Sequence, residues 1–145
     1  MISLASCETM DLFEKNVAIP QHAWESRLKP ELQFEIKDTS ASYRVFFVIR
    51  HTDAYEYNNI WVNLTSTSPG DTVSVSQKFE FQLATYDKWT GSGIDDIFEH
   101  RIQLYRQPVK FKNKGVYKVR LEQLMRDDPL KNILNVGLRV EKAQR

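Results

Sequence analysis

The sequence is poor in cysteine and has no long apolar segment, and each absence limits what the protein can be. Its 145 residues include one cysteine, Cys7, which excludes an internal disulfide framework and any zinc site built from several cysteines. The three histidines, His22, His51 and His100, show no metal-ligand spacing, so each is expected to be an ordinary surface or half-buried residue. No apolar run approaches the roughly 18 residues of a membrane-spanning helix. We therefore expect no metal, no cofactor and no catalytic residue.

The sequence also has little net charge, because basic and acidic residues nearly balance. The formal net charge is +1 and the pI is 7.8. A nucleic-acid-binding domain usually has a clustered basic face and a pI above about 9, so no nucleic-acid partner is expected. Hydrophobic residues make up 41% of the chain, which is enough to form the core of one globular domain and argues against disorder.

Apolar and polar residues alternate with a period of two from residue 33 onward, as in half-buried strands. The alternating runs are residues 33–37, 60–64, 73–83, 117–121 and 136–140. Residues 43–49 are apolar on both faces, as expected of a central strand. The turn-forming segment 68–71 separates two of the runs, as in a hairpin. We predict an all-β fold, a two-sheet antiparallel β-sandwich of seven or eight strands, with a barrel as the alternative.

A single helix signal interrupts the strand pattern. Asp128 could cap a helix, Pro129 would occupy its first position, and Leu130, Ile133 and Leu134 would share one face. One short helix is therefore predicted near residues 128–134.

The N-terminal part of the chain is patterned differently. Residues 8–32 show weak periodicity and are expected to run along the surface, held by Val17, Ile19 and Trp24. Residues 33–145 are expected to form the sandwich, so that the chain is a single domain.

The first seven residues end in Leu4-Ala5-Ser6-Cys7, which resembles the lipobox of bacterial lipoproteins. Small residues there fit the signal peptidase, and only a thiol can form the thioether that carries the lipid. A charged segment and an apolar stretch of about 7–15 residues should precede such a site. Only residues 1–6 precede Cys7, too few for both parts. Residues 1–7 are therefore interpreted as the remnant of a signal peptide, with Cys7 as the lipidated residue. The alternative is a disordered tail with a chance cysteine.

Residues 87–96 form the first candidate for a functional site. They combine Gly91 and Gly93 with the carboxylates of Asp87, Asp95 and Asp96. Their order matches no calcium-binding loop, so the glycines are expected to serve turns that need a positive φ. An enzyme based on Asp95, Asp96 and the nearby Glu99 is the least favoured hypothesis, because the sequence identifies no other catalytic side chains that would act with these carboxylates.

An aromatic patch is the second candidate. Tyr55, Tyr57 and Trp61 surround a polar turn that contains Asn58 and Asn59. Aromatic rings beside amides can bind a sugar or form a protein interface, and they can equally cover the core. Trp89 is expected to belong either to this surface or to the core.

Two glycosylation patterns also occur. Asp71-Thr72-Val73 resembles the O-glycosylation motif of periplasmic proteins of the Bacteroidota, which makes Thr72 a candidate site. Asn63-Leu64-Thr65 matches an N-glycan sequon that is expected to be unused within a bacterial strand.

Taken together, these segments resemble the GldH family of gliding-motility lipoproteins of the Bacteroidota. The resemblance covers nearly the whole chain from Cys7 onward and is carried by residues 4–7 (LASC), 34–39 (FEIKDT), 49–61 (IRHTDAYEYNNIW), 88–93 (KWTGSG), 122–126 (EQLMR) and 136–142 (VGLRVEK). It implies a lipid-anchored envelope protein, in the outer membrane and facing the periplasm. It further implies an association with gliding motility and with machinery linked to type 9 secretion.

Two functions of different classes follow. The first is a non-enzymatic assembly lipoprotein that docks onto another envelope protein. The second is a module that binds carbohydrate or peptidoglycan through the same aromatic residues, although a β-sandwich supports that only by analogy.

Overall fold

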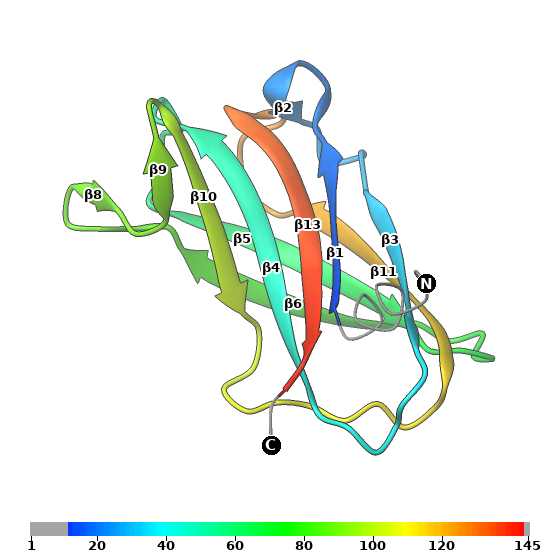
Figure 1. Cartoon of the computed structure of the whole chain (residues 1–145). Coiled ribbons are helices and arrows are strands. Elements are labelled where there is room, and N and C mark those ends of the chain that lie inside the picture. The colour runs from blue at the N-terminus through cyan, green and yellow to red at the C-terminus, as the bar shows by residue number, and fades with distance from the viewer. Residues whose placement is uncertain (1–11, 144–145) are drawn as a thin grey trace, which may run out of the picture.

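Two antiparallel sheets face each other in the computed structural model, which describes residues 12–143 (Figure 1). The five-stranded sheet has the order β1-β13-β4-β10-β9, and the four-stranded sheet has the order β3-β11-β5-β6. The strands of the first sheet are β1 (Leu12–Ala18), β4 (Tyr43–Thr52), β9 (Ser92–Ile94), β10 (Ile97–Gln103) and β13 (Ile133–Lys142). Those of the second are β3 (Glu31–Ile36), β5 (Asn59–Thr67), β6 (Val75–Gln82) and β11 (Gly115–Gln123). The predicted β-sandwich is confirmed.

The period-two pattern places the apolar residues of each strand between the sheets. In β3 the residues Leu32, Phe34 and Ile36 are buried and their neighbours are exposed. Antiparallel pairing sets Phe34 opposite Tyr117 of β11, and the two rings stack with their centroids 5.6 Å apart. Cross-strand aromatic pairs of this kind stabilise a sheet and fix its register.

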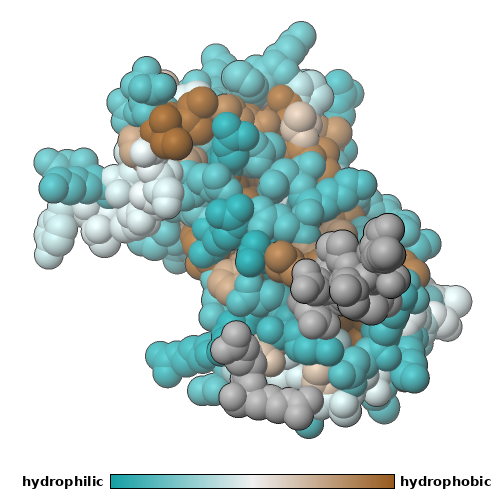
Figure 2. Space-filling model, in the orientation of Figure 1, coloured by the Kyte–Doolittle hydropathy of each residue, from teal (hydrophilic) through white to brown (hydrophobic). Residues whose placement is uncertain are grey.

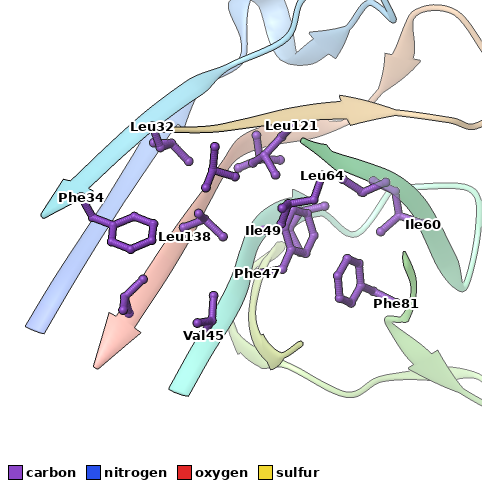
Figure 3. Packing of buried hydrophobic residues seen from close by; sticks show 14 of the residues in the cluster. Leu32, Phe34, Val45, Phe47, Ile49, Ile60, Leu64, Phe81, Leu121 and Leu138 are labelled. Atoms are coloured by element: carbon purple, nitrogen blue, oxygen red, sulfur yellow. The ribbon is translucent and has the colours of Figure 1, made fainter. Parts of the chain in front are cut away.

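The hydrophobic core lies between the two sheets (Figure 3). Phe47 of β4 stacks on Phe81 of β6 across the space between the sheets, with ring centroids 4.5 Å apart. Leu138, which lies opposite Phe47 in the pairing of β13 with β4, and Leu121 are also fully buried. Val48, on the outer face of β4, is also fully buried, which agrees with the prediction of a central strand.

The short helix predicted near residues 128–134 is wrong. Leu130–Lys131 form β12, which pairs with β2 (Ala23–Trp24), and β13 starts at Ile133. The Asp128 carboxylate accepts hydrogen bonds from Ser26 (backbone N 2.8 Å, Oγ 2.6 Å) and so caps no helix. Strand pairing places Leu130 opposite Trp24, and both are buried together with Ile133. Within residues 12–143 the helical structure is a 3-10 turn at Pro20–His22.

Part of the weakly patterned N-terminal segment forms a sheet edge. Residues 12–18 are β1, which pairs with β13 over its whole length, from Leu12 opposite Glu141 to Ala18 opposite Asn135. Ile19 and Trp24 are buried, as expected, and Val17 is half-buried. Alternation is weak in β1 because an edge strand packs only part of one face on the core.

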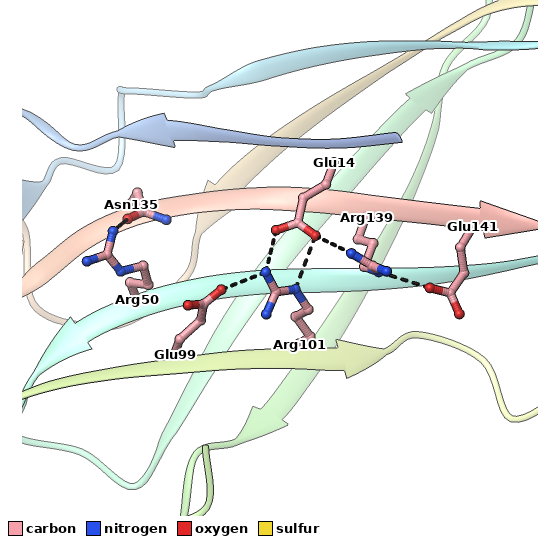
Figure 4. Close-up of polar contacts among 7 residues, drawn as sticks. All are labelled: Glu14, Arg50, Glu99, Arg101, Asn135, Arg139 and Glu141. Atoms are coloured by element: carbon pink, nitrogen blue, oxygen red, sulfur yellow. Dashed lines mark hydrogen bonds and ion pairs between the residues drawn. The ribbon is translucent and has the colours of Figure 1, made fainter. Parts of the chain in front are cut away.

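Charged side chains tie β1 to the outer face of its sheet (Figure 4). The Glu14 carboxylate accepts hydrogen bonds from Arg101 of β10 (2.8 Å) and from Arg139 of β13 (2.7 Å). These ion pairs hold the pKa of Glu14 below its usual value, with the Arg101 hydrogen bond as the largest cause. Glu99 and Glu141 extend the network to either side.

The sandwich has two distinct ends, which β4 connects. We call the end at Thr52 the hairpin end; it comprises the turn 53–58, the hairpin of β7 (Ala84–Thr85) with β8 (Lys88–Trp89), and the β9–β10 turn. We call the end at Tyr43 the coil end; it comprises the start of β1, the loop 37–42 and the coil 104–114. Ten residues of strand separate the two ends by about 30 Å.

Candidate functional site

The hairpin end gathers most of the residues that the sequence singled out. Backbone hydrogen bonds join its turns: Asp53 N–H donates to the Asp96 carbonyl (2.7 Å), and Leu83 N–H donates to the Asn58 carbonyl (2.7 Å). The three turns therefore form one connected surface. The hairpin of β7 and β8 projects from it, as Figure 1 shows.

An aromatic cluster lies beneath these turns. The ring of His51 contacts Trp89 (centroids 4.5 Å), Tyr55 (5.4 Å), Phe98 (5.9 Å) and His100 (5.0 Å). These residues come from β4, the turn after it, β8 and β10. The cluster supports the projecting turns by packing, since aromatic pairs at these distances are attractive.

Two histidines at the centre of the cluster are hydrogen-bonded to each other. His51 and His100 are 0% and 4% exposed, and their Nε2 atoms are 3.0 Å apart. His51 Nδ1 lies 2.8 Å from the Thr52 carbonyl, which can only accept, so Nδ1 carries a hydrogen. In the neutral pair His51 Nε2 is then the acceptor and His100 Nε2–H the donor.

Burial keeps this histidine pair neutral. Desolvation is the main cause that lowers the pKa of both rings, and the pKa of His100 falls to about 4, with the charge of His51 as a second cause. The expectation that these two histidines lie on the surface or are half-buried is wrong, whereas His22 is exposed. The signal was available for His51, because it continues the inward-facing positions Phe47 and Ile49 of β4.

The two predicted tyrosines are more buried than a binding surface requires. Tyr55 is 4% exposed, and its hydroxyl donates to the Asn59 carbonyl (2.8 Å). Tyr57 is half-buried, and its hydroxyl donates to the Asp127 carboxylate (2.7 Å). Trp89 is half-buried, with its indole N–H donating to Asp53 (2.8 Å). All three support the turns from below.

The remaining patch residues point elsewhere. Asn58 is exposed in the turn, and Asn59 donates its amide to Glu80 of β6 (2.8 Å). Trp61 is 41% exposed on β5, on the opposite face from Ile60 and Val62. The structure therefore brings Tyr55, Tyr57 and Trp89 together and leaves Trp61 on the outer face of the other sheet.

Segment 87–96 contains the short strands β8 and β9. Neither Gly91 nor Gly93 has a positive φ, so the predicted reason for these glycines is wrong. Both serve close approach: a Cβ at position 91 would collide with the Glu99 carbonyl, and one at 93 would meet the Phe98 ring at 2.5 Å. Asp87, Asp95 and Asp96 are exposed. Within residues 12–143, no three His, Cys, Asp or Glu side chains are grouped closely enough to bind a metal.

Two exposed apolar residues at the turn tips were not predicted from the sequence. Tyr86 is fully exposed at the tip of the β7–β8 hairpin, with φ 57°, and Ile94 at the end of β9 is 79% exposed. Figure 2 shows apolar surface gathered at this end of the molecule beside the projecting hairpin. Strands of two or three residues are too short to produce a periodic signal, which is why these tips were not predicted.

Two shallow clefts flank the loop that carries Tyr55 and Tyr57. One, of about 280 Å³, lies between this loop and the β7–β8 hairpin. The other, of about 410 Å³, lies between the loop and residues 127–132. The surface that a partner would meet is thus a set of raised turns with grooves between them.

The two predicted modification sites lie away from the hairpin end. Thr72 is exposed in the turn between β5 and β6, and its glycosylation stays a prediction. Cys7 lies outside the described residues, and its lipidation likewise stays a prediction.

Comparison with known proteins identifies the family. The family model described as GldH lipoprotein matches residues 11–140. The chain belongs to this family. Among curated relatives, the gliding motility lipoprotein GldH homolog of Christiangramia forsetii is 27% identical over 151 residues, covering 99% of this chain and 91% of the relative. The gliding motility lipoprotein GldH of Flavobacterium johnsoniae is 28% identical over 149 residues, covering 97% and 91%.

Membership of the GldH family confirms the resemblance found in the sequence and makes the chain a lipid-anchored protein of the cell envelope. Among residues 12–143, no helix is long and apolar enough to cross a bilayer. Among solved structures, the VP2 subviral particle of infectious bursal disease virus is similar over 89% of this chain and 32% of that chain. Its TM-score is 0.34 and its identity 12%, which is too distant to inform function.

Proposed function

We propose that this GldH-family chain is a non-enzymatic assembly lipoprotein that docks onto another envelope protein through its hairpin end. A lipid on Cys7 holds it on the outer membrane, with the folded domain facing the periplasm. Its role is accessory, within the gliding machinery or the machinery linked to type 9 secretion. Family membership supports the cellular context, and the hairpin end supports the mode of action.

The observation that carries the docking proposal is the pair of exposed apolar tips above a rigid support. Tyr86 and Ile94 are 102% and 79% exposed, yet each stands on a short hairpin fixed by the aromatic cluster around His51. Large apolar residues held on rigid turns lose little entropy on binding and are typical of interface hot spots. Asp87, Asp95 and Asp96 border them, so a partner with a basic rim is favoured.

The glycan-binding alternative has weaker support. Stacking on a sugar needs aromatic faces open to solvent, and Tyr55 is buried while Tyr57 and Trp89 are half-buried with their polar atoms already bonded. An enzymatic role is also disfavoured, because Glu99 is paired with Arg101 (2.9 Å) and the histidine pair is inaccessible.

The test replaces both tips in the lipidated protein, as Tyr86→Ser with Ile94→Ser, and captures partners from envelope extracts of a Bacteroidota host. Recovery of a partner captured by the unmodified protein is expected to fall at least about ten-fold, because hot-spot side chains dominate affinity. The matched control is Val73→Ser with Val75→Ser, which removes two other largely exposed apolar residues, 72% and 66% exposed, at the start of β6.

Equal recovery with both variants would refute docking through the hairpin end. The cellular role is tested separately, by complementing a deletion strain with each variant and scoring surface spreading and type 9 secretion. The docking proposal requires that the tip variant fail in at least one of these assays while the control restores both.

A further inference from the structure

The coil end carries a concentrated positive charge that the docking proposal does not use. Residues 103–116 contain no Asp or Glu and four cations, Arg106, Lys110, Lys112 and Lys114. All four are exposed, and within the described part of the chain none of them forms an ion pair. A chain with a net charge of only +1 therefore has a strongly basic segment at one end.

Packing fixes the direction in which Lys110 and Lys112 point. The backbones of Val109 and Tyr43 of β4 form two hydrogen bonds: Tyr43 N–H donates to the Val109 carbonyl (2.7 Å), and Val109 N–H donates to the Tyr43 carbonyl (2.8 Å). Leu104 N–H donates to the Val45 carbonyl (2.8 Å). Phe111 turns inward and contacts the rings of Tyr43 (5.5 Å) and Tyr117 (4.9 Å). Lys110 and Lys112 alternate with these inward residues and so face solvent.

We call the segment that joins Cys7 to β1 the tether. The first residue of β1, where the tether is attached, lies beside this basic coil. Leu12, the first residue of β1, lies opposite Glu141 of β13. The next residue of β13, Lys142, lies opposite Tyr43 of β4, and Tyr43 in turn pairs with Val109 of the coil. Figure 1 shows the start of β1 and the yellow coil at the same end of the sandwich. Five residue steps separate Leu12 from Cys7, so a lipid on Cys7 would keep this end within about 18 Å of its attachment point.

The opposite end has the opposite charge. Seven carboxylates, which outnumber the exposed cations Lys88, Arg126 and Lys131 beside them, are gathered on the turns of the hairpin end and on residues 127–128, namely Asp53, Glu56, Asp87, Asp95, Asp96, Asp127 and Asp128. Some carboxylates also lie near the coil: Asp38 is bound by Lys142 (3.4 Å), and Asp71 lines a cavity that residues 109–113 of the coil also line. The molecule is thus polarised along β4, with its basic end at the tether.

We propose that the coil end of this protein lies on the headgroups of an anionic lipid bilayer. The coil binds phosphate groups through Arg106, Lys110, Lys112 and Lys114, and the acidic hairpin end points away from the membrane. The proposal deepens the proposed function, on which its account of the tether rests: the lipid supplies attachment, the basic coil supplies orientation, and the docking tips are presented about 30 Å from the surface.

The first test removes the anchor, so that only the coil is measured. The full-length chain carrying Cys7→Ser is mixed with phosphatidylcholine vesicles, with or without phosphatidylglycerol, and the bound fraction is measured by flotation. Binding is expected only with phosphatidylglycerol and should weaken as salt is raised. Each basic residue near an anionic surface strengthens binding roughly five-fold, so Lys110→Glu with Lys112→Glu should weaken it at least about 25-fold.

The matched control is Lys88→Glu with Lys131→Glu, which makes the same change of net charge far from the coil: Lys88 lies in the hairpin end, Lys131 lines the cleft beside it, and both are exposed. This control is expected to bind as the Cys7→Ser parent does. No binding to the anionic vesicles, or an equal loss in both variants, would overturn the proposal. These outcomes do not depend on lipidation or on docking, so they are distinguishable from a failure of the proposed function.

The second test measures orientation in the lipidated protein. Lys112→Cys and Lys88→Cys each add one thiol for a fluorescent probe, and quenchers placed on the lipid headgroups report its distance from the bilayer. Strong quenching is expected at position 112 and none at 88. Equal quenching at both positions, or the reverse pattern, would contradict the proposed orientation.

Discussion

At the scale of single residues, the contact between His51 and His100 has the clearest physical consequence. Each ring is buried among aromatic groups, and the hydrogen bond between the two Nε2 atoms requires that at least one ring be neutral. A proton added to the pair would place a charge in an apolar cluster, where desolvation is costly. The hairpin end is therefore built on a group that resists protonation.

Acid is expected to destabilise the fold through this pair. An unfolded histidine takes up a proton near pH 6.5, whereas in the fold burial lowers the pKa of His100 to about 4. Between these values the unfolded state binds more protons, so the free energy of unfolding should fall as the pH drops from about 6.5 to about 4, by on the order of 2 kcal/mol. Chemical denaturation at a series of pH values measures this slope.

The variant His100→Gln serves as the comparison for that slope. It removes the titrating group, so its free energy of unfolding should depend less on pH in the window between about 4.5 and 6.5, above the range in which Glu14 titrates. Parallel curves for the two proteins would show that the histidine pair does not control acid sensitivity.

At the scale of elements, β1 depends on a glycine in its neighbour. Gly137 of β13 lies opposite Asn16, and a Cβ there would collide with the Lys15 carbonyl and meet Asn16 Oδ1 at 2.5 Å. The absence of a side chain lets β1 approach β13 closely. Glu14 and its two arginine partners then fasten the strand from the outer face.

Replacing this glycine should release β1. Gly137→Ala is expected to lower the free energy of unfolding by about 1–3 kcal/mol, because overpacking in a buried sheet forces the backbone apart. Hydrogen exchange should show loss of amide protection in residues 12–18, while β3 and β11 in the other sheet keep theirs. Unchanged protection in β1 would mean that the sheet absorbs the methyl group elsewhere.

At the scale of the whole molecule, we expect the fold and the membrane attachment to be separable, because the hydrophobic core is closed between the two sheets. Within residues 12–143, no helix is long and apolar enough to span a bilayer. An attached diacylglycerol would supply stable anchoring by itself, since buried methylenes contribute about 0.8 kcal/mol each.

Cys7→Ser should therefore release the protein from the membrane without changing its stability. In a Bacteroidota host the variant is expected in the soluble fraction and without acyl mass, while its thermal unfolding matches that of the unmodified domain. Retention of acyl mass in the variant would place the lipid on another residue. Coil-end binding to lipid alone, as proposed above, is weaker and should be removed by high salt.

Local pattern was sufficient wherever a strand was long and had one buried face. The alternation in residues 33–37, 117–121 and 136–140 predicted β3, β11 and β13, and the all-β sandwich followed from it, because a period of two is a property of the strand itself. The lipobox resemblance and the family resemblance also came from the sequence alone, and the second is confirmed.

Other features depended on which segments meet in space. Residues 128–134 have a helical pattern, but Leu130 finds a partner strand in Trp24, and pairing outweighs local propensity. The histidine pair joins β4 to β10, the tips Tyr86 and Ile94 belong to strands too short for periodicity, and the basic coil lies beside the tether only because β4 pairs with both β13 and residue 109. Such contacts are set by the closure of the two sheets around a common core, which no local pattern encodes.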